Sequence, residues 1–149
     1  MKKQSGFTLI ELLLVLAIIG IISAIAIPAL LGQRERAKAK AVQANLDACA
    51  SECARLNDTY KEQGKTPTAA NIVTDVLTLP NFLAANAKNP YDGSSAAYIG
   101  ASVGTNGQVG LSGGTVTDAT GLSYQAVTIQ ANYLVGGAAA SLKKVVGLD

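Results

Sequence analysis

The sequence has 149 residues, enough for one domain and an anchor. Taking Lys2 and Lys3 from its 12 basic residues leaves ten, equal to the number of acidic residues. Such a neutral remainder lacks the positive surface on which nonspecific nucleic-acid binding rests, so we expect no nucleic-acid partner. The chain contains no histidine, the commonest general base, and no glycine-rich phosphate loop after a strand. We therefore expect no enzyme, no catalytic residue and no cofactor.

A long apolar segment dominates the N-terminal part of the chain. Residues 6–31 read GFTLIELLLVLAIIGIISAIAIPALL, and residues 12–31 contain no ionisable side chain. As a helix, residues 7–31 would extend roughly 37 Å at about 1.5 Å per residue. That length is sufficient to cross a hydrocarbon core about 30 Å thick, where only a helix satisfies its own backbone hydrogen bonds. The segment is predicted to be a transmembrane helix.

Glu11 is the one carboxylate within this segment, and two interpretations of it remain open. In the first, Thr8 caps the helix and Glu11 reaches back to a free amide three residues earlier, as in a capping box. A carboxylate in the first turn also suits the helix dipole. In the second, Glu11 requires a positive partner from another chain, because an unpaired charge in lipid is costly.

The N-terminus resembles that of a type IV prepilin. The resemblance rests on the sequence GFTLIE at residues 6–11, which follows a short leader with Lys2 and Lys3 and precedes a long apolar run. It implies that prepilin peptidase cuts between Gly6 and Phe7 and methylates the new amino group of Phe7. The matching segment ends at about Pro28, so the remainder of the chain must be interpreted independently.

The same resemblance implies which residues serve filament assembly. Glu11 and Phe7 are expected to set the register of the subunit in a filament. Gly20 and Pro28 are expected to loosen the helix as it packs. The implied fold is α+β, the type IV pilin fold, with a long N-terminal helix packed against a small antiparallel sheet.

The location of the globular part depends on the resemblance. The basic residues after the apolar run are at least as numerous as those before it; they are Arg34, Arg36, Lys38 and Lys40. Their number alone does not place the C-terminal part outside the cytoplasm. The resemblance does, and it implies a precursor in the cytoplasmic membrane and a mature subunit in an extracellular pilus on the bacterial surface.

The helix is predicted to continue beyond the apolar run, with amphipathic character over residues 32–63. Residues 33–63 contain neither proline nor glycine and are rich in good helix formers. Apolar residues recur every three or four positions, at Val42, Leu46, Cys49, Cys53, Leu56 and Tyr60. This single stripe must be buried by the later chain. Gly64 is the predicted helix C-cap.

Cys49 and Cys53 lie on this stripe, and their redox state is left open. Four residues apart on a helix, their Cβ atoms would be about 5–6 Å apart, whereas a disulfide requires roughly 3.5–4.5 Å. We favour two free buried thiols over a strained local disulfide or links between subunits. Two cysteines without histidine form an incomplete ligand set, so we expect no metal site.

Residues 64–149 are predicted to form a globular domain of short helices, loops and antiparallel strands. Residues 68–79 and 81–87 have helical patterns, and residues 87–95 form a loop. Residues 96–103 and 108–112 are expected to pair as a hairpin around Asn106-Gly107. Residues 122–134 alternate as a long strand. Residues 138–146 are either helix or strand.

Two short motifs in the chain are interpreted as having no separate function. Asp92, with Asn89 and Ser94 nearby, has too few ligands and the wrong spacing for a calcium loop, so a turn is favoured. Residues 57–59 match an N-glycosylation acceptor, but a chance match within a helix is favoured.

These observations predict a structural protein with four parts. They are a leader at residues 1–6, a transmembrane and filament-core helix at 7–31, an amphipathic helix at 32–63 and a globular domain at 64–149. The resemblance implies a major pilin that forms a homo-oligomeric helical filament. Its expected partners are prepilin peptidase, the pilus assembly machinery and, before assembly, the membrane. The alternatives are a pseudopilin of type II secretion or competence, and a single-pass, membrane-anchored binding module.

Overall fold

The computed structural model describes residues 6–82, 86–101, 103 and 105–148. By its internal contacts the chain divides into two compact units, Met1–Arg34 and Glu35–Asp149. Most of the predicted leader, residues 1–5, lies outside the described residues. So do residues 83–85, part of the predicted 81–87 helix, and residue 102 of the predicted 96–103 strand.

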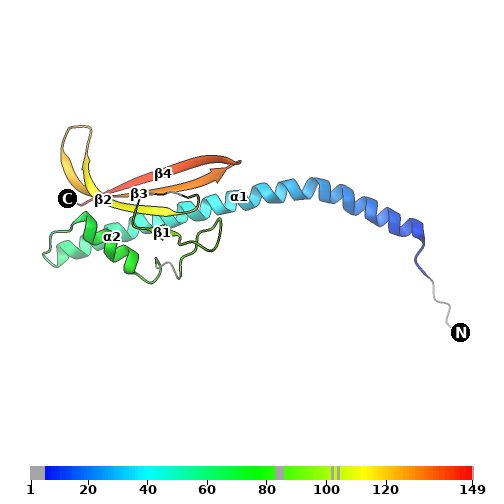
Figure 1. Cartoon of the computed structure of the whole chain (residues 1–149), viewed down its shortest axis with the longest axis horizontal. Helices are drawn as coiled ribbons and strands as arrows, with labels where there is room; N and C mark the ends of the chain where they lie inside the picture. The colour runs from blue at the N-terminus through cyan, green and yellow to red at the C-terminus, as the bar shows by residue number, and fades with distance from the viewer. Residues whose placement is uncertain (1–5, 83–85, 102, 104, 149) are drawn as a thin grey trace. The chain divides into compact units, whose positions relative to one another are not determined.

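One helix, α1, runs from Leu9 to Glu62, as the sequence predicts (Figure 1). It ends in a Schellman motif, in which the Gly64 amide donates to the Lys61 carbonyl and the Lys65 amide donates to the Tyr60 carbonyl. Gly64 has a φ of 67°, a left-handed conformation that favours glycine. The predicted role of Gly64 as the C-cap residue is confirmed.

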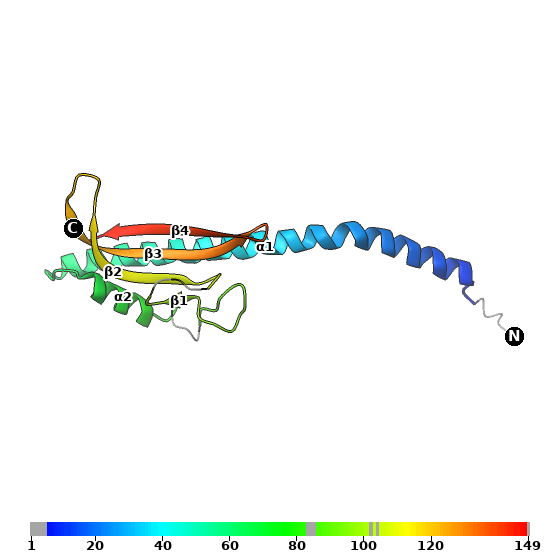
Figure 2. The ribbon, with the colours of Figure 1, turned by 45° about the horizontal axis from the view of Figure 1, so that its top comes forward.

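A four-stranded sheet of order β1-β2-β3-β4 covers the second part of α1, residues 35–62 (Figures 1 and 2). Its strands are β1 (Tyr98–Ile99), β2 (Val109–Thr117), β3 (Ser123–Val135) and β4 (Ala138–Gly147). The pairs β2–β3 and β3–β4 are antiparallel. The α+β prediction is therefore confirmed.

The core lies between α1 and the sheet. On α1, Val42, Leu46, Cys49 and Cys53 are at most 1% exposed, which confirms this part of the predicted stripe. The sheet contributes alternate residues of β2 and β3; they are Val109, Leu111, Val127, Ile129, Ala131 and Tyr133. Full burial of one such large apolar side chain stabilises a fold by about 1.5–3 kcal/mol. This packing fixes the sheet on the helix stripe.

The short helix α2 (Ala69–Thr78) packs against β2. Thr68 caps its N-terminus, because the Thr68 hydroxyl accepts a hydrogen bond from the Asn71 amide. A Cβ atom at Gly113 of β2 would lie 2.7 Å from the backbone of Ala69. Only glycine permits so close an approach of β2 to α2. The predicted helix at residues 68–79 is confirmed.

The predicted hairpin around Asn106-Gly107 is wrong. β1 pairs with β2 in parallel, with Tyr98 opposite Val109 and Ile99 opposite Gly110. Gly107 does adopt a φ of 91°, but its amide donates to the Asn132 carbonyl of β3. The turn chemistry was identified correctly, but the loop returns the chain alongside β1 in the same direction.

The C-terminal segment, which the sequence leaves between helix and strand, is the strand β4. A two-residue turn joins it to β3, with φ values of 59° at Gly136 and 81° at Gly137. Positive φ at both central positions is the requirement of a type I′ hairpin turn. These glycines direct the chain back along β3, and pairing with β3 makes the C-terminal segment a strand and not a helix.

Candidate functional site

The N-terminus of α1 is a complete capping box. The Thr8 amide and hydroxyl each donate a hydrogen bond to Glu11 Oε2 at 2.8 Å. In return, the Glu11 amide donates to Thr8 Oγ1 at 3.3 Å. Helix geometry begins at Leu9, so Gly6 and Phe7 precede the helix. The capping interpretation of Glu11 is thus confirmed for the single chain, and a contact between chains is not tested by it.

The apolar part of α1 is exposed along its length. Phe7 is 91% exposed, and the large apolar residues from Leu9 to Leu31 are all between 47% and 76% exposed. An 18-residue window of this helix has a mean hydropathy of 2.9, and it is long and apolar enough to cross a membrane. Such a surface is unfavourable in water and must be covered by lipid or by protein.

Gly20 and Pro28 lie within α1, and the helix continues through both. A Cβ atom at Gly20 would meet nothing within 4 Å, so packing within the single chain does not require glycine there. Pro28 has no amide hydrogen, so the Ala24 carbonyl receives no helical hydrogen bond from it. Both residues weaken the helix locally, and at position 20 no contact among the described residues requires glycine.

Cys49 and Cys53 are unpaired thiols, each 0% exposed, and α1 remains continuous through them. The neighbouring Cys53 thiol and burial both raise the pKa of the Cys49 thiol above its usual range. A buried, protonated thiol is a poor nucleophile and a poor metal ligand. Among the described residues there is no group of three or more His, Cys, Asp and Glu side chains suited to a metal ion.

A loop before β1 is fastened to both α1 and β3 by Tyr91. The Tyr91 hydroxyl donates to the Leu134 carbonyl at 3.3 Å and accepts from the Leu134 amide at 3.0 Å. Lys38 donates to the Tyr91 carbonyl, and its ammonium lies 5.3 Å from the centre of the Tyr91 ring. Tyr91 therefore provides hydrogen-bond partners for the backbone of Leu134, which lies beyond the part of β3 that pairs with β2.

Asp92 and Asn89 form turns in this loop, as predicted. Asp92 Oδ1 accepts from the amides of Ser94 and Ser95, and Asp92 Oδ2 accepts from the Ser95 hydroxyl. The Ser95 hydroxyl and these amides lower the pKa of Asp92. Asn89 is 2% exposed and donates to the Ser95 hydroxyl and to the Asn106 carbonyl. The Asp92 carboxylate thus stabilises the backbone of the turn at residues 92–95.

Asn57, the first residue of the glycosylation-like motif, is buried in α1. Its side chain is 7% exposed, and its Oδ1 atom has no hydrogen-bond partner among the described residues. An asparagine so placed is inaccessible in the folded chain. The chance-match interpretation agrees with this burial.

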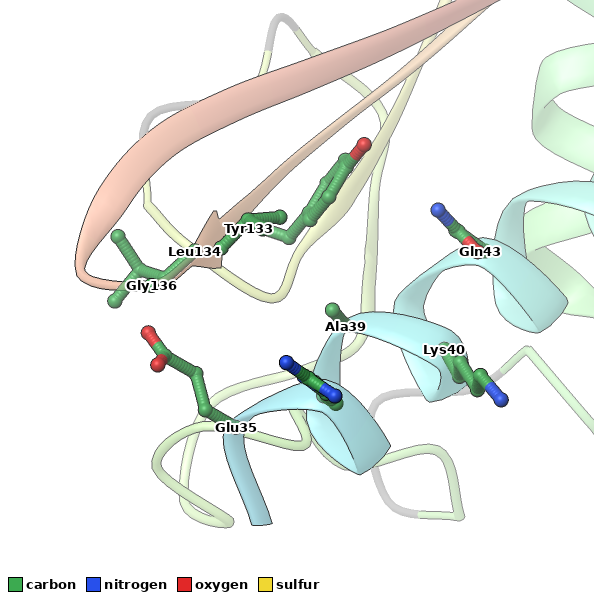
Figure 3. A pocket seen from close by; sticks show the side chains of 9 residues that line it. Glu35, Ala39, Lys40, Gln43, Tyr133, Leu134 and Gly136 are labelled. Carbon is green, nitrogen blue, oxygen red and sulfur yellow. The ribbon is translucent and has the colours of Figure 1, made fainter. Parts of the chain in front are cut away.

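A cavity of about 240 Å³ lies between α1 and the β3–β4 turn (Figure 3). Its lining comprises Glu35, Arg36, Ala39, Lys40, Gln43 and residues 133–136. The Glu35 carboxylate points towards the turn and accepts a hydrogen bond from the Gly137 amide at 3.0 Å. This links the second part of α1 to the hairpin.

Sequence reasoning missed the cavity and the role of Tyr91. The residues that line the cavity come from two segments about 90 positions apart, and none of them belongs to a recognisable motif. A sequence signal does exist in Gly136-Gly137, because a two-glycine turn brings two strands into register. For Tyr91, the sequence offered only an aromatic residue in a loop.

Comparisons with known proteins identify the N-terminal part of the chain. A family model, the prokaryotic N-terminal methylation motif, matches residues 1–27. The chain is 53% identical over 47 residues to the type IV wide pilus major component PilA4 of Thermus thermophilus, covering 32% of this chain and 36% of the relative. It is 41% identical over 76 residues to the type IV major pilin protein PilA of Myxococcus xanthus, covering 46% and 34%.

Another relative belongs to a secretion system. The type II secretion system core protein G of Klebsiella michiganensis is 30% identical over 93 residues, covering 62% of this chain and 63% of the relative. The match spans less than two thirds of the length of each of these three relatives. No solved structure gives a significant match. With its methylation motif, its apolar N-terminal helix and its pilin-like α+β fold, the chain belongs to the family of type IV pilins and pseudopilins that carry the N-terminal methylation motif.

Proposed function

We propose that this protein is the structural subunit of a type IV pilus. The observation that carries the proposal is the exposed apolar helix at residues 9–31, which a single chain in water leaves uncovered. In the precursor, lipid covers this helix. In the filament, the same helices of neighbouring copies cover one another, and the globular domains lie outside.

Processing prepares the chain for assembly. Prepilin peptidase removes residues 1–6 by cutting between Gly6 and Phe7, and it methylates the Phe7 amino group. Gly6 and Phe7 precede the first helical residue, Leu9, and both are exposed, so the cleavage site is accessible to a peptidase. The pilus assembly machinery then moves the subunit from the cytoplasmic membrane into the surface filament.

Glu11 selects the position of each incoming subunit. Cleavage creates a positive amino group on Phe7, and the apolar run offers no Lys or Arg side chain. The Phe7 amino group of a neighbouring chain is therefore the available cation for Glu11. In a dry helical core a charge pair is far stronger than in water, and a missing partner costs about 3–5 kcal/mol.

Gly20 and Pro28 assist this packing. Each weakens the helix, and no contact among the described residues requires glycine at position 20. They allow local adjustment of α1 when residues 7–31 exchange lipid for neighbouring helices.

A pseudopilin is the second candidate, and a specific observation favours it. The similarity to core protein G extends over 93 residues, farther along the chain than the 47 residues shared with the Thermus pilus component. A pseudopilin would use the same processing and the same helix in a short periplasmic fibre. The two candidates differ in where the fibre lies and in what its loss prevents.

The decisive experiment is intact-mass analysis of subunits from sheared surface filaments, with electron microscopy of the same preparation. We expect a mature chain that begins at methylated Phe7. The Gly6→Leu variant should remain unprocessed in the membrane, whereas Gly32→Leu, a control at an uncrowded helix glycine, should be processed normally. Subunits that retain residues 1–6 within filaments would refute the processing step. Loss of protein export without loss of surface filaments in a deletion strain would identify a pseudopilin.

A further inference from the structure

The connection between β2 and β3 forms a stiff hairpin tip, defined here as residues 118–122. The Asp118 amide donates to the Leu122 carbonyl at 2.9 Å, and Asp118 Oδ1 accepts from the amides of Thr120 and Leu122 and from the Thr120 hydroxyl. The Thr120 hydroxyl and these amides lower the pKa of Asp118. Below the tip, Thr117 and Ser123 are joined through their hydroxyls at 2.8 Å. The tip is thus ordered before it meets any partner.

Leu122 is an apolar side chain displayed on this tip. It is 67% exposed, although the backbone of Leu122 is fully engaged in the turn. Outside residues 7–31, the other large apolar residues described as exposed are Val135 and Val145. Figures 1 and 2 show the β2–β3 connection turning away from the sheet, so neither the sheet nor α1 covers it. Leu122 is therefore available for contact with another molecule.

The cavity beside the β3–β4 turn, described above, has the size and lining to receive such a side chain (Figure 3). Its apolar lining comes from Ala39 and from Tyr133, Leu134 and Val135. Arg36 and Lys40 also line it, and neither forms an ion pair with another described residue. Glu35 is the one acidic residue of the lining, and it is engaged by the Gly137 amide. The unengaged charge around the cavity is therefore positive.

The hairpin tip and the cavity lie at opposite ends of the same strand. β3 begins at Ser123, directly after the tip, and ends at Val135, which lines the cavity. Thirteen residues of strand extend about 40 Å at about 3.3 Å per residue. The tip of one chain therefore cannot fill its own cavity. A contact between them must therefore join two copies, and in a filament whose subunits all have the same orientation this contact is head to tail.

We propose that, in the assembled filament, the hairpin tip of one subunit inserts Leu122 into the cavity of a second copy, while Asp118 faces Arg36 and Lys40. The proposal rests on the filament function proposed above and assigns a contact between globular domains. The apolar side chain supplies burial, and the opposite charges align the two surfaces. The contact repeats along the filament, since every subunit presents both a tip and a cavity.

Site-directed cross-linking in purified filaments tests this contact. The double variant Leu122→Cys/Val135→Cys should form a ladder of covalent multimers under mild oxidation or with a short bismaleimide, because a disulfide requires Cα atoms within about 7 Å. The matched control Lys143→Cys/Val135→Cys moves the first cysteine to an exposed position on β4 and should form no ladder. The buried native cysteines are present in both variants and are not expected to react.

The outcomes separate this inference from the proposed function. Filaments without a ladder would overturn the contact and leave the filament function intact. Absence of filaments from the unmodified protein would overturn the function itself. A ladder of equal strength in the control pair would also overturn the contact, because it would show unspecific encounters between filaments.

A second set of variants examines the energetic role of the tip. Leu122→Ser keeps every backbone bond of the turn and should lower filament yield about tenfold through lost burial. Val145→Ser, an equally polar change at another exposed apolar residue, should leave the yield unchanged. Asp118→Asn keeps the Oδ1 acceptor but removes the charge, so it should lower the yield at low salt and match the unmodified protein at high salt. Equal yields of all three variants and the unmodified protein would contradict the contact.

Discussion

The two parts of α1 have the same backbone but different solutions for their apolar side chains. In residues 9–31 the large apolar residues surround the helix and are exposed, whereas in residues 35–62 a single stripe is buried under the chain's own sheet. Both ends of the helix are capped locally, by Thr8 and Glu11 at the start and by Gly64 at the finish. The free backbone groups at both ends of the helix thus find partners within the chain.

The difference teaches where each part obtains its stability. The second part is stabilised within the molecule, and its side chains specify a fold. The first part is apolar all round, as expected of a helix that is buried only in a membrane or among other helices. Substitutions in the two parts should therefore fail in different assays.

The largest effect is expected from a charge placed in the first part. Leu16→Lys introduces an ammonium group at an exposed position of the helix. According to the proposed function, lipid covers this position first and neighbouring helices cover it in the filament. A lysine at the centre of a membrane helix costs about 2.5–3.5 kcal/mol for insertion alone. We expect no filaments. Ala48→Lys, at an exposed position in the second part, should assemble normally. Equal assembly of both variants, judged by filament yield, would remove the distinction between the two parts.

The next largest effect is expected at Glu11. Glu11→Ala should be inserted and cleaved but should assemble poorly, because the Phe7 amine of a neighbour loses its partner. Thr8→Ala removes capping hydrogen bonds without removing the charge, and it should cost only about 1 kcal/mol at the helix end. Glu11→Asp, which keeps the charge and shortens its reach, should be intermediate. Filament yield measured beside the membrane pool decides: similar, near-normal yields for Glu11→Ala and Thr8→Ala would leave Glu11 with capping alone.

A core substitution in the second part should act on folding. Leu46→Ala removes a fully buried side chain and should lower the free energy of unfolding by about 2–5 kcal/mol. Leu30→Ala, at a position 57% exposed, should change it little. Denaturant unfolding of the full chain in detergent, followed by the sheet signal in circular dichroism, measures both. The comparison breaks down if Leu30→Ala is as destabilising as Leu46→Ala.

The thiols of the second part should be protected from alkylation. The raised pKa of Cys49 leaves little thiolate at pH 8, and burial excludes the reagent. Relative to a Ser51→Cys control on an exposed face of the same helix, we expect much slower alkylation of both native thiols, because burial excludes the reagent from each of them. Unfolding should abolish the difference. Rapid native alkylation, or a disulfide in nonreducing peptide mapping, would contradict free buried thiols.

The smallest effect is expected from an ion pair between α1 and the sheet. Lys144 of β4 donates to Asp47 at 2.6 Å, but the two side chains are 51% and 62% exposed. Lys144→Met should lower the free energy of unfolding by at most about 1 kcal/mol, and the effect should disappear at high salt. A larger loss that persists in salt would contradict a weak surface ion pair, because methionine keeps an unbranched stem of similar length and removes only the charge and its hydrogen bond.

The sequence predicts best where structure follows from local chemistry. Apolar periodicity, the Gly64 cap and the Thr8–Glu11 spacing depend on neighbouring residues only, and all three features are present. β3 was also predictable, because its residues alternate and its core-facing side is apolar.

The remaining elements depend on distant contacts. β4 is rich in alanine and lysine, which favour helix over strand, and its strand state comes from pairing with β3. β2 extends to Thr117 through Gly113 and Gly114, which weaken a strand signal, although Gly113 is needed for the approach of Ala69. Lys144 lies opposite the buried Ile129, at a β4 position where alternation would predict an apolar residue. Because this position holds a lysine that pairs with Asp47, the alternating pattern of β4 cannot be recognised in the sequence.

The burial of Asn57 has a consequence for the order of events during biosynthesis. A glycosyltransferase must hold an acceptor asparagine in an accessible, extended segment, whereas this asparagine faces the interior from a continuous helix. Sugar transfer and the docking of α1 on its sheet are thus mutually exclusive at this position. A glycan on Asn57 would mark a chain that had been modified before it folded and that was thereby prevented from reaching the filament.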